Sequence, residues 1–312
     1  MQDIACRLAR EHCPDIRVHL VSTPYFNASM APNGMMQIWT GLLLRMDNEA
    51  QLAAVIGHEI GHYLERHQVE RLRDAKDRMA FAQFLGAFGL VGALGQLVVI
   101  AGALAYTRDQ ERAADRIGVE LMRNAGYDPA QAATVWGNLL LELKARDDGE
   151  PELDSPLFAT HPAPEERQAA LSALSAAARG GEVHEERWRS SIGRHLRAWL
   201  EEEVRHGRHE QSIALLTRLI ARSPQQAEFP YARAEVLRRR ARADDYDRAL
   251  GDYAAAAGLG GEPPETYRGL GLIYRAQQQP SEANASFRRY LELAPNAPDA
   301  LMIRSYMEES AT

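Results

Sequence analysis

A helical pattern of apolar residues runs through positions 48–67, NEAQLAAVIGHEIGHYLERH. Leu52, Val55, Ile56 and Ile60 recur at intervals of three and four residues, which places them on one face of a helix. The spacing therefore predicts an amphipathic helix and not a strand. The rest of the first half of the chain is interpreted around this helix.

Extended segments precede this helix. Residues 16–21 alternate and are rich in β-branched side chains, which predicts a strand. Residues 26–39 contain two extended runs around the turn-forming sequence Pro32-Asn33-Gly34, which predicts a β-hairpin or a short meander. An exposed edge of this hairpin could bind an extended substrate peptide, while a purely structural hairpin is the alternative. The candidate substrate-binding residues are Asn27, Ala28, Ser29 and Met30.

Helical patterns dominate the remainder of the first half. Together with the small sheet they predict a mainly α chain that begins with an α+β domain. These further helices are expected at 4–12, 107–121 and 130–145, and in a segment that opens within 160–167 and continues to about 178.

The second half of the chain repeats a helix-pair pattern. One copy matches the spacing of a tetratricopeptide unit at Leu270, Gly271, Tyr274, Ala283, Phe287 and Pro295. Because a single helix pair cannot bury its own apolar face, such pairs stack into an all-α solenoid. Gly180-Gly181 marks the boundary, so the predicted domains are 1–182 and 183–312. Three pairs and a capping helix through Met307 are expected, near 193–226, 227–263 and 264–297.

Composition narrows the classes of partner. The 312 residues are 46% hydrophobic and carry a net charge of -7, which argues against nucleic acid as a partner. The only cysteines are Cys6 and Cys13, too few for a disulfide scaffold. On one continuous helix their Cα atoms would lie about 10 Å apart, so a bridge is doubtful, although Pro14 is expected to end that helix. The start lacks a signal-peptide pattern, which indicates a cytosolic protein or a chain without its leader.

The chemistry is concentrated in the predicted helix 48–67. His58 and His62 are separated by one turn and lie on one face, where two imidazoles can bind one Zn²⁺. Glu59 lies beside them, placed to accept a proton from a metal-bound water. A helix that carries two histidines by chance is the alternative. Gly57 and Gly61 argue against it, because glycines next to both histidines indicate a close approach of main chain or substrate.

A hydrolytic zinc site needs a third protein ligand. We expect Glu111, on the next polar helix, with Asp115 one turn later as the acceptor for the ring N–H of a ligand histidine. An ordinary surface ExxxD pattern is the alternative. His67 should point away, since five residues past His62 correspond to about 140° around a helix. His161 could stabilise the oxyanion, cap the zinc, or be a satisfied loop histidine.

These motifs together resemble metallopeptidase family forty-eight, which includes prenyl-protease, HtpX, Oma and BepA-like enzymes. The resemblance rests on HEIGH, ERAAD, FNASMAPNG followed by GLL, and THP, and it covers about residues 16 to 175. It implies a zincin-type zinc endopeptidase with one Zn²⁺ held by His58, His62 and Glu111, and with Glu59 as general base. The repeats narrow the resemblance to the BepA-like periplasmic type.

This resemblance further implies cleavage of misfolded or misassembled proteins of the bacterial periplasm or cell envelope. Its substrates would be proteins or peptides, and its repeats would contact clients or other assembly proteins. The alternative from another class is a chaperone or assembly scaffold whose zinc site is occluded or structural. An intact Glu59 beside the histidines favours the enzyme.

The apolar segment 84–106 bears on the membrane question. Its length could cross a bilayer of about 30 Å. A single crossing would leave His58 and Glu111 on opposite sides of the membrane, where they could not share one zinc. We therefore expect a bent helical pair, broken near Gly95-Gln96, that packs over the active-site cleft. Peripheral contact with a membrane surface is the alternative.

Overall fold

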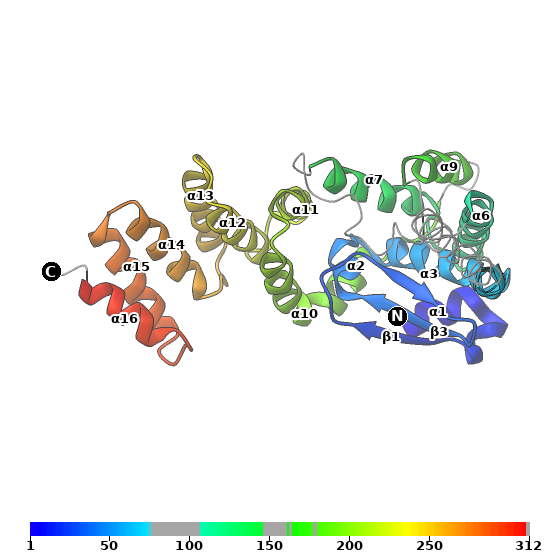
Figure 1. The fold of residues 1–312 in the computed structure, drawn as a ribbon, viewed down its shortest axis with the longest axis horizontal. Coiled ribbons are helices and arrows are strands. Elements are labelled where there is room, and N and C mark those ends of the chain that lie inside the picture. The colour runs from blue at the N-terminus through cyan, green and yellow to red at the C-terminus, as the bar shows by residue number, and fades with distance from the viewer. Residues whose placement is uncertain (75, 77–106, 146–160, 162–163, 177–179, 310–312) are drawn as a thin grey trace, which may run out of the picture. The chain divides into compact units, whose positions relative to one another are not determined.

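The computed structural model describes the chain except residues 75, 77–106, 146–160, 162–163, 177–179 and 310–312. The prediction for 84–106 lies outside the described residues. The chain divides into two compact units (Figure 1), Met1–Leu141 with Asp148–Leu196, and Glu142–Asp147 with Arg197–Thr312. The fold is mainly α with one small sheet, as predicted from the sequence.

The first unit begins with helix α1 (Gln2–Ala9) and a 3₁₀ helix, η1 (Arg10–Asp15). Cys6 and Cys13 form a disulfide with their Cα atoms 4.5 Å apart, so the doubt about this bridge was wrong. The doubt assumed one continuous helix, whereas α1 ends at Ala9 and Arg10 adopts a positive φ of 50°. The chain therefore turns back and brings the second sulfur to the first.

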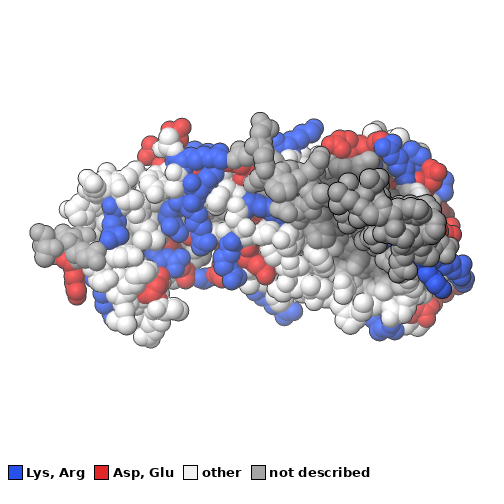
Figure 2. All heavy atoms as spheres, viewed as in Figure 1, with Lys and Arg blue, Asp and Glu red and all other residues white. Residues whose placement is uncertain are grey.

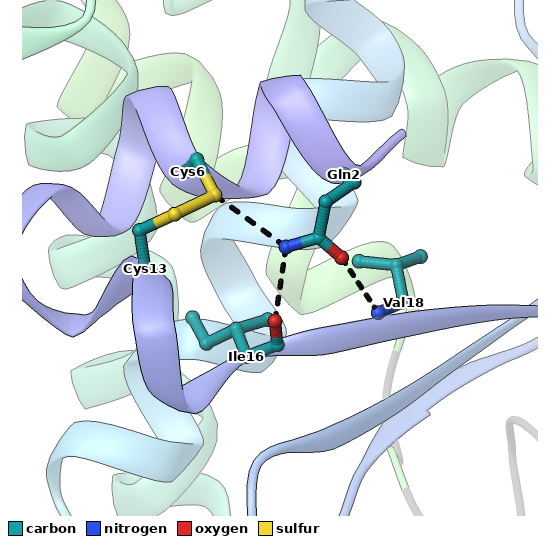
Figure 3. The surroundings of a disulfide bond; sticks show 5 residues. All are labelled: Gln2, Cys6, Cys13, Ile16 and Val18. Atoms are coloured by element: carbon teal, nitrogen blue, oxygen red, sulfur yellow. Dashed lines mark hydrogen bonds between the residues drawn. A yellow bond between two sulfur atoms is a disulfide. The ribbon is translucent and has the colours of Figure 1, made fainter.

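A three-stranded sheet follows, in the order β1-β3-β2. β1 (Arg17–Val21) pairs in parallel with β3 (Met35–Trp39), and β2 (Ala28–Met30) pairs antiparallel with β3. The predicted hairpin is thus confirmed. The Gln2 amide donates to Ile16 O at 2.9 Å and accepts from Val18 N at 3.0 Å beside the disulfide (Figure 3). The start of the outer edge of β1 is therefore already occupied by a side chain.

The predicted central helix is α3 (Glu49–Leu64), preceded by the short α2 (Thr40–Arg45). The Asn48 side chain accepts a hydrogen bond from Gln51 N at 2.9 Å and so caps the helix. In Figure 1, α3 lies between the sheet and the helices α7 (Ala130–Lys144) and α9 (Pro164–Ala176). Helix α6 (Arg108–Asn124) opens with a capping box formed by Thr107 and Gln110.

Helices α3 and α6 pack with their main chains in near contact. A Cβ built on Gly61 would lie 2.9 Å from Ala114 O, and one on Gly57 would lie 3.2 Å from Gly118 O. The expectation that these glycines mark a close approach of main chain is confirmed. The approach holds the histidines of α3 beside the carboxylates of α6.

The second unit is built from consecutive helices that fall where three helix pairs and a cap were predicted. The small residues of the pattern allow tight packing, since a Cβ on Gly271 would lie 2.3 Å from the Phe287 ring. The division between the units lies inside α10, after Leu196, whereas the sequence placed the domain boundary at 182. The helices are α10 (Glu185–His206), α11 (His209–Arg222), α12 (Glu228–Arg240), α13 (Asp245–Leu259), α14 (Glu265–Ala276), α15 (Pro280–Leu293) and α16 (Ala300–Glu309).

Among the described helices, none combines the length and the apolar character needed to cross a bilayer.

Candidate metal centre

Four side chains converge inside the first unit. Two belong to α3, one belongs to α6, and the fourth is His161, which precedes α9. His58, His62, Glu111 and His161 each offer one ligand atom, and these atoms all lie within 4.8 Å of one another. All four residues are buried. The sequence therefore folds so that segments about 50 and 100 residues apart supply one cluster.

The spacing of these atoms fits a single zinc ion. Four ligands at zinc–nitrogen distances of about 2.0–2.1 Å in a tetrahedron lie roughly 3.3 Å from one another. His62 Nε2 lies 3.1 Å from His58 Nε2 and 3.3 Å from Glu111 Oε1, and His58 Nε2 lies 3.3 Å from His161 Nδ1. The 2.8 Å between His161 Nδ1 and Glu111 Oε1 is a direct hydrogen bond. The donor set of imidazoles and one carboxylate is also the set that zinc accepts.

Burial and hydrogen bonding set the charges of these ligands. Burial lowers the pKa of His62 to about 2, which keeps this imidazole neutral with a lone pair for a metal. For Glu111, burial alone would raise the pKa, but hydrogen bonds with His161 and His62 outweigh it. The pKa of Glu111 therefore lies below its usual range and the carboxylate is charged. Neutral imidazoles and an anionic carboxylate are the forms that bind a cation.

Glu59 lies on α3 between the two histidines of the HExxH sequence. It is 2% exposed, and its Oε1 lies 3.6 Å from His161 Nε2. Burial raises the pKa of Glu59, because the charged form loses its hydration. A carboxylate with a raised pKa is a better proton acceptor than a solvated one.

Asp115 and His67 each contact a histidine of α3 at its ring nitrogen Nδ1. Asp115 Oδ1 lies 2.9 Å from His58 Nδ1, and His67 Nδ1 lies 3.0 Å from His62 Nδ1. The expectation that His67 points away was wrong in direction. Helix α3 ends at Leu64 and Arg66 has a φ of 55°, so the chain turns His67 back toward the site. His67 nevertheless remains outside the group of four candidate ligands.

Sequence reasoning missed Arg167 of α9. Its guanidinium lies 2.9 Å from Glu111 Oε2, forms a two-pronged ion pair with Asp115, and stacks 4.0 Å from the centre of the Trp136 ring. The signal was available in principle. Two buried carboxylates one turn apart require a cation, and this arginine lies only six residues beyond His161.

The predicted substrate strand, residues 27–30, lies in and before β2 at the free edge of the sheet, and β2 packs against α3. Trp39 N donates to Asn27 O at 3.1 Å, so the alternation of the strand turns the main-chain groups of Ala28 and Met30 away from β3. No described residue hydrogen bonds to those groups. Phe26 lines a cavity of about 30 Å³ together with His58, Glu59, Trp136 and Arg167.

Comparisons with known proteins agree with this geometry. Peptidase family M48 matches residues 1–175. The mitochondrial metalloendopeptidase OMA1 of Arabidopsis thaliana is 33% identical over 140 residues, which cover 44% of this chain and 29% of that protein. The beta-barrel assembly-enhancing protease of Escherichia coli is 31% identical over 163 residues, covering 48% and 32%.

A third relative, OMA1 of Schizosaccharomyces pombe, is 34% identical over 122 residues, which cover 38% of this chain and 36% of that protein. The matched segments thus span about a third of the length of these relatives. The family match, by contrast, covers more than half of this chain and includes every residue of the metal cluster. The protein therefore belongs to peptidase family M48.

Proposed function

We propose that this protein is a zinc-dependent endopeptidase in which His58, His62 and Glu111 hold the metal and Glu59 is the general base. The observation that carries the proposal is the spacing of the ligand atoms, which is that of one tetrahedral site. Bound zinc would supply two effects, a lowered pKa for a water molecule and polarisation of the scissile carbonyl. The protein's own residues perform the remaining steps.

Glu59 handles the protons in this mechanism. It accepts a proton from the attacking water and passes it to the amine of the departing peptide. Its burial keeps solvent from competing for that proton, and its raised pKa brings it closer to that of the water it must deprotonate. Asp115 accepts the Nδ1–H of His58, which leaves the Nε2 lone pair of that ring for the metal.

His161 is proposed to cap the metal in the resting protein. Its Nδ1 is directed at the ligand cluster, 2.8 Å from Glu111 and 3.3 Å from His58 Nε2. This placement supports a fourth ligand more than an oxyanion donor, because a donor must leave room for the carbonyl that it contacts. Peptide hydrolysis then requires His161 to withdraw so that water and substrate can approach.

The edge of β2 is the proposed site for substrate main chain. An extended peptide can pair with the outward groups of Ala28 and Met30, which run beside α3. The other edge of the sheet is less suitable, since Gln2 already occupies the groups of Ile16 and Val18. This edge selects for an unfolded or extended segment, which fits a substrate that is misfolded or incompletely assembled.

The repeats of the second unit are proposed to bind protein partners. A cavity of about 380 Å³ is lined by residues of four helices, including Leu200 of α10, Tyr231 and Glu235 of α12, Arg268 of α14 and Tyr290 of α15. The view in Figure 2 shows basic and acidic side chains interspersed over this unit. A mixed, partly apolar hollow suits a polypeptide segment better than a nucleic acid.

The proposed location is the bacterial periplasm or cell envelope. The Cys6–Cys13 disulfide supports an oxidising compartment, because cytosolic thiols are kept reduced. The relative in Escherichia coli is a beta-barrel assembly-enhancing protease, whereas the OMA1 relatives are mitochondrial. An assembly role for this chain is therefore proposed from the first relative together with the disulfide.

The central test compares the parent with Glu59→Gln. The amide keeps the shape of the side chain but cannot accept the proton, so we expect full zinc content and a loss of casein cleavage of at least about 10²-fold. Glu120→Gln makes the same chemical change at an exposed position of α6 and is the matched control, which should keep parental cleavage. Undiminished casein cleavage by Glu59→Gln would refute the proposed mechanism, in which Glu59 is the general base.

A scaffold with an occluded zinc site is the second candidate, and the position of His161 among the ligands favours it. His161→Ala separates the two. A capped protease should cleave casein faster in this variant, whereas a scaffold should bind unfolded clients and show no cleavage in either form. Zinc content should stay at one ion per chain in both cases.

A further inference from the structure

Arg167 is a buried cation in contact with the residues proposed to surround the metal. It is 5% exposed and belongs to α9, while its partners belong to α3 and α6. Its Nε donates to Asp115 Oδ2 at 3.0 Å and its Nη2 to Asp115 Oδ1, so both carboxylate oxygens are engaged by one planar group. Its Nη1 lies 2.9 Å from Glu111 Oε2. A fork of this kind fixes orientation as well as charge.

The fork determines what His58 can do. Both Asp115 Oδ1 and Arg167 Nη2 lie 2.9 Å from His58 Nδ1. An arginine N–H can only donate, and donation to Nδ1 would leave the proton on Nε2, where it blocks a metal. Donation by Nδ1–H to Asp115 leaves Nε2 free instead. Holding the Asp115 carboxylate at this nitrogen therefore favours the metal-binding tautomer of His58.

Charge balance requires the same cation. Glu59, Glu111 and Asp115 bring three negative charges into a buried site, and a divalent metal supplies only two positive charges. Arg167 supplies the third. The Trp136 ring, 4.0 Å from the guanidinium carbon, holds the planar group in place without neutralising it.

We propose that Arg167 is the positioning residue of the metal site, acting through Asp115 on His58 and directly on Glu111. The inference rests on the proposed function, since it assumes that these residues hold a divalent metal. In this role Arg167 orients His58, Glu111 and Asp115. It does so from α9, a helix that carries no proposed metal ligand. Arg167 touches neither substrate nor reacting atoms in this role.

The test measures metal affinity, not only activity. Arg167→Lys keeps the charge but removes the fork, so we expect zinc affinity, measured by competition with a chelating dye, to fall about 10–100-fold. The absorption spectrum of the cobalt-substituted protein should change as well, because the ligand geometry relaxes. Arg112→Lys is the matched control. It lies on α6 in an exposed ion pair with Asp109 and should leave affinity and spectrum unchanged.

A double-mutant cycle tests the route through Asp115. Asp115→Asn should lower zinc affinity by a similar factor, and adding Arg167→Lys to it should then cost little more, because both changes break one interaction. Additive losses would overturn the route through Asp115. If Arg167→Lys does not fold, Asp115→Asn alone decides, and parental affinity in that variant overturns the inference.

The outcomes separate this inference from the proposed function. Parental affinity and an unchanged cobalt spectrum in Arg167→Lys would overturn the positioning role while leaving the zinc site intact. A parent that binds neither zinc nor cobalt would refute the proposed function itself. A lower melting temperature of the metal-free Arg167→Lys variant, with its zinc affinity unchanged, would reveal a merely structural ion pair and overturn the positioning role.

Discussion

The two units hold their buried charges in different ways. In the first unit, Arg167 pairs with Asp115 across 52 positions of sequence and contacts His58 across 109. In the second unit, Arg238 pairs with Glu235 three positions away and Arg240 with Asp245 five positions away. These two pairs of the second unit are local in sequence, and the further pair of Arg240 with Glu210 spans only 30 positions, while the charges of the first unit need several distant elements in place at once.

This difference has a consequence for stability. A repeat unit can lose a local ion pair without disturbing distant helices, because each pair contacts mainly its neighbours. The group of four candidate ligands has no such independence, since α3, α6 and His161 each contribute to it and Arg167 of α9 contacts Glu111. Changes in the first unit should therefore affect both folding and metal binding, and changes in the second unit should affect folding alone.

The largest expected effect concerns where the first unit ends. Trp188 of α10 is buried, and its indole N–H donates to Met46 O at 2.9 Å. Arg187, one position earlier, pairs with Glu49 in the first turn of α3. A chain that stops at Leu196 should fold and bind zinc. One that stops at residue 185 loses the tryptophan and should be destabilised by about 3–5 kcal/mol.

Denaturant unfolding and zinc content of the two truncated chains provide the measurement. Equal stability would restore the boundary at 182 that the sequence suggested. It would also show that α10 does not contribute to the stability of the first unit.

The disulfide gives the next largest effect, and it should be confined to the first unit. Closing the short loop between Cys6 and Cys13 is expected to contribute about 2–3 kcal/mol through the unfolded chain. Cys6→Ser, or a reductant added to the parent, should lower the first unfolding transition by that amount. Hydrogen exchange in α14 and α15 should stay the same. Cys6→Ser should also become insensitive to reductant, and a reductant effect that persists would contradict the assignment.

The glycine contacts also differ between the two units. A Cβ on Gly61 meets the main chain of α6, whereas a Cβ on Gly271 meets the side chain of Phe287. Both Gly→Ala variants should cost about 1–3 kcal/mol through overpacking. Only Gly61→Ala should also weaken zinc binding, because it separates α3 from the helix that carries Glu111. Equal zinc affinity in the two variants would show that the cluster tolerates a shift of α6.

The sequence predicted the local features of both units and missed those that depend on contacts between distant segments. The hairpin, α3 and the helix pairs follow from periodicity and turn residues. The direction of His67 and the disulfide were misjudged because each argument extended a helix past a residue with positive φ, Arg66 or Arg10. Arg167 was missed because its partners lie on α6 and α3, 52 and 109 positions away, although the two buried carboxylates of α6 called for a cation.

The smallest expected effect is a pH dependence in the second unit. Asp245 accepts hydrogen bonds from Arg240 Nε and Nη2 at 2.9 and 2.6 Å, and these bonds hold the pKa of its carboxyl below the usual range. A carboxyl whose pKa is lowered by folding stabilises the folded state at pH values above its pKa in the unfolded chain, which is about 3.9. That contribution is lost as the pH falls through the lower, folded value.

Asp245→Asn should therefore cost about 1 kcal/mol near pH 7 and less at pH 3. Asp115 of the first unit provides the contrast. Burial opposes ionisation there, but the charge of Arg167 lowers the pKa to about 2, so the contribution of Asp115 should be lost only as the pH falls toward about 2. Hydrogen exchange of α12 and α13, compared with α3 and α6 between pH 6 and pH 3, measures both in one chain. If exchange in α3 and α6 accelerates at a higher pH than exchange in α12 and α13, the Arg240–Asp245 pair resists acid better than the Arg167–Asp115 pair, and the expectation is contradicted.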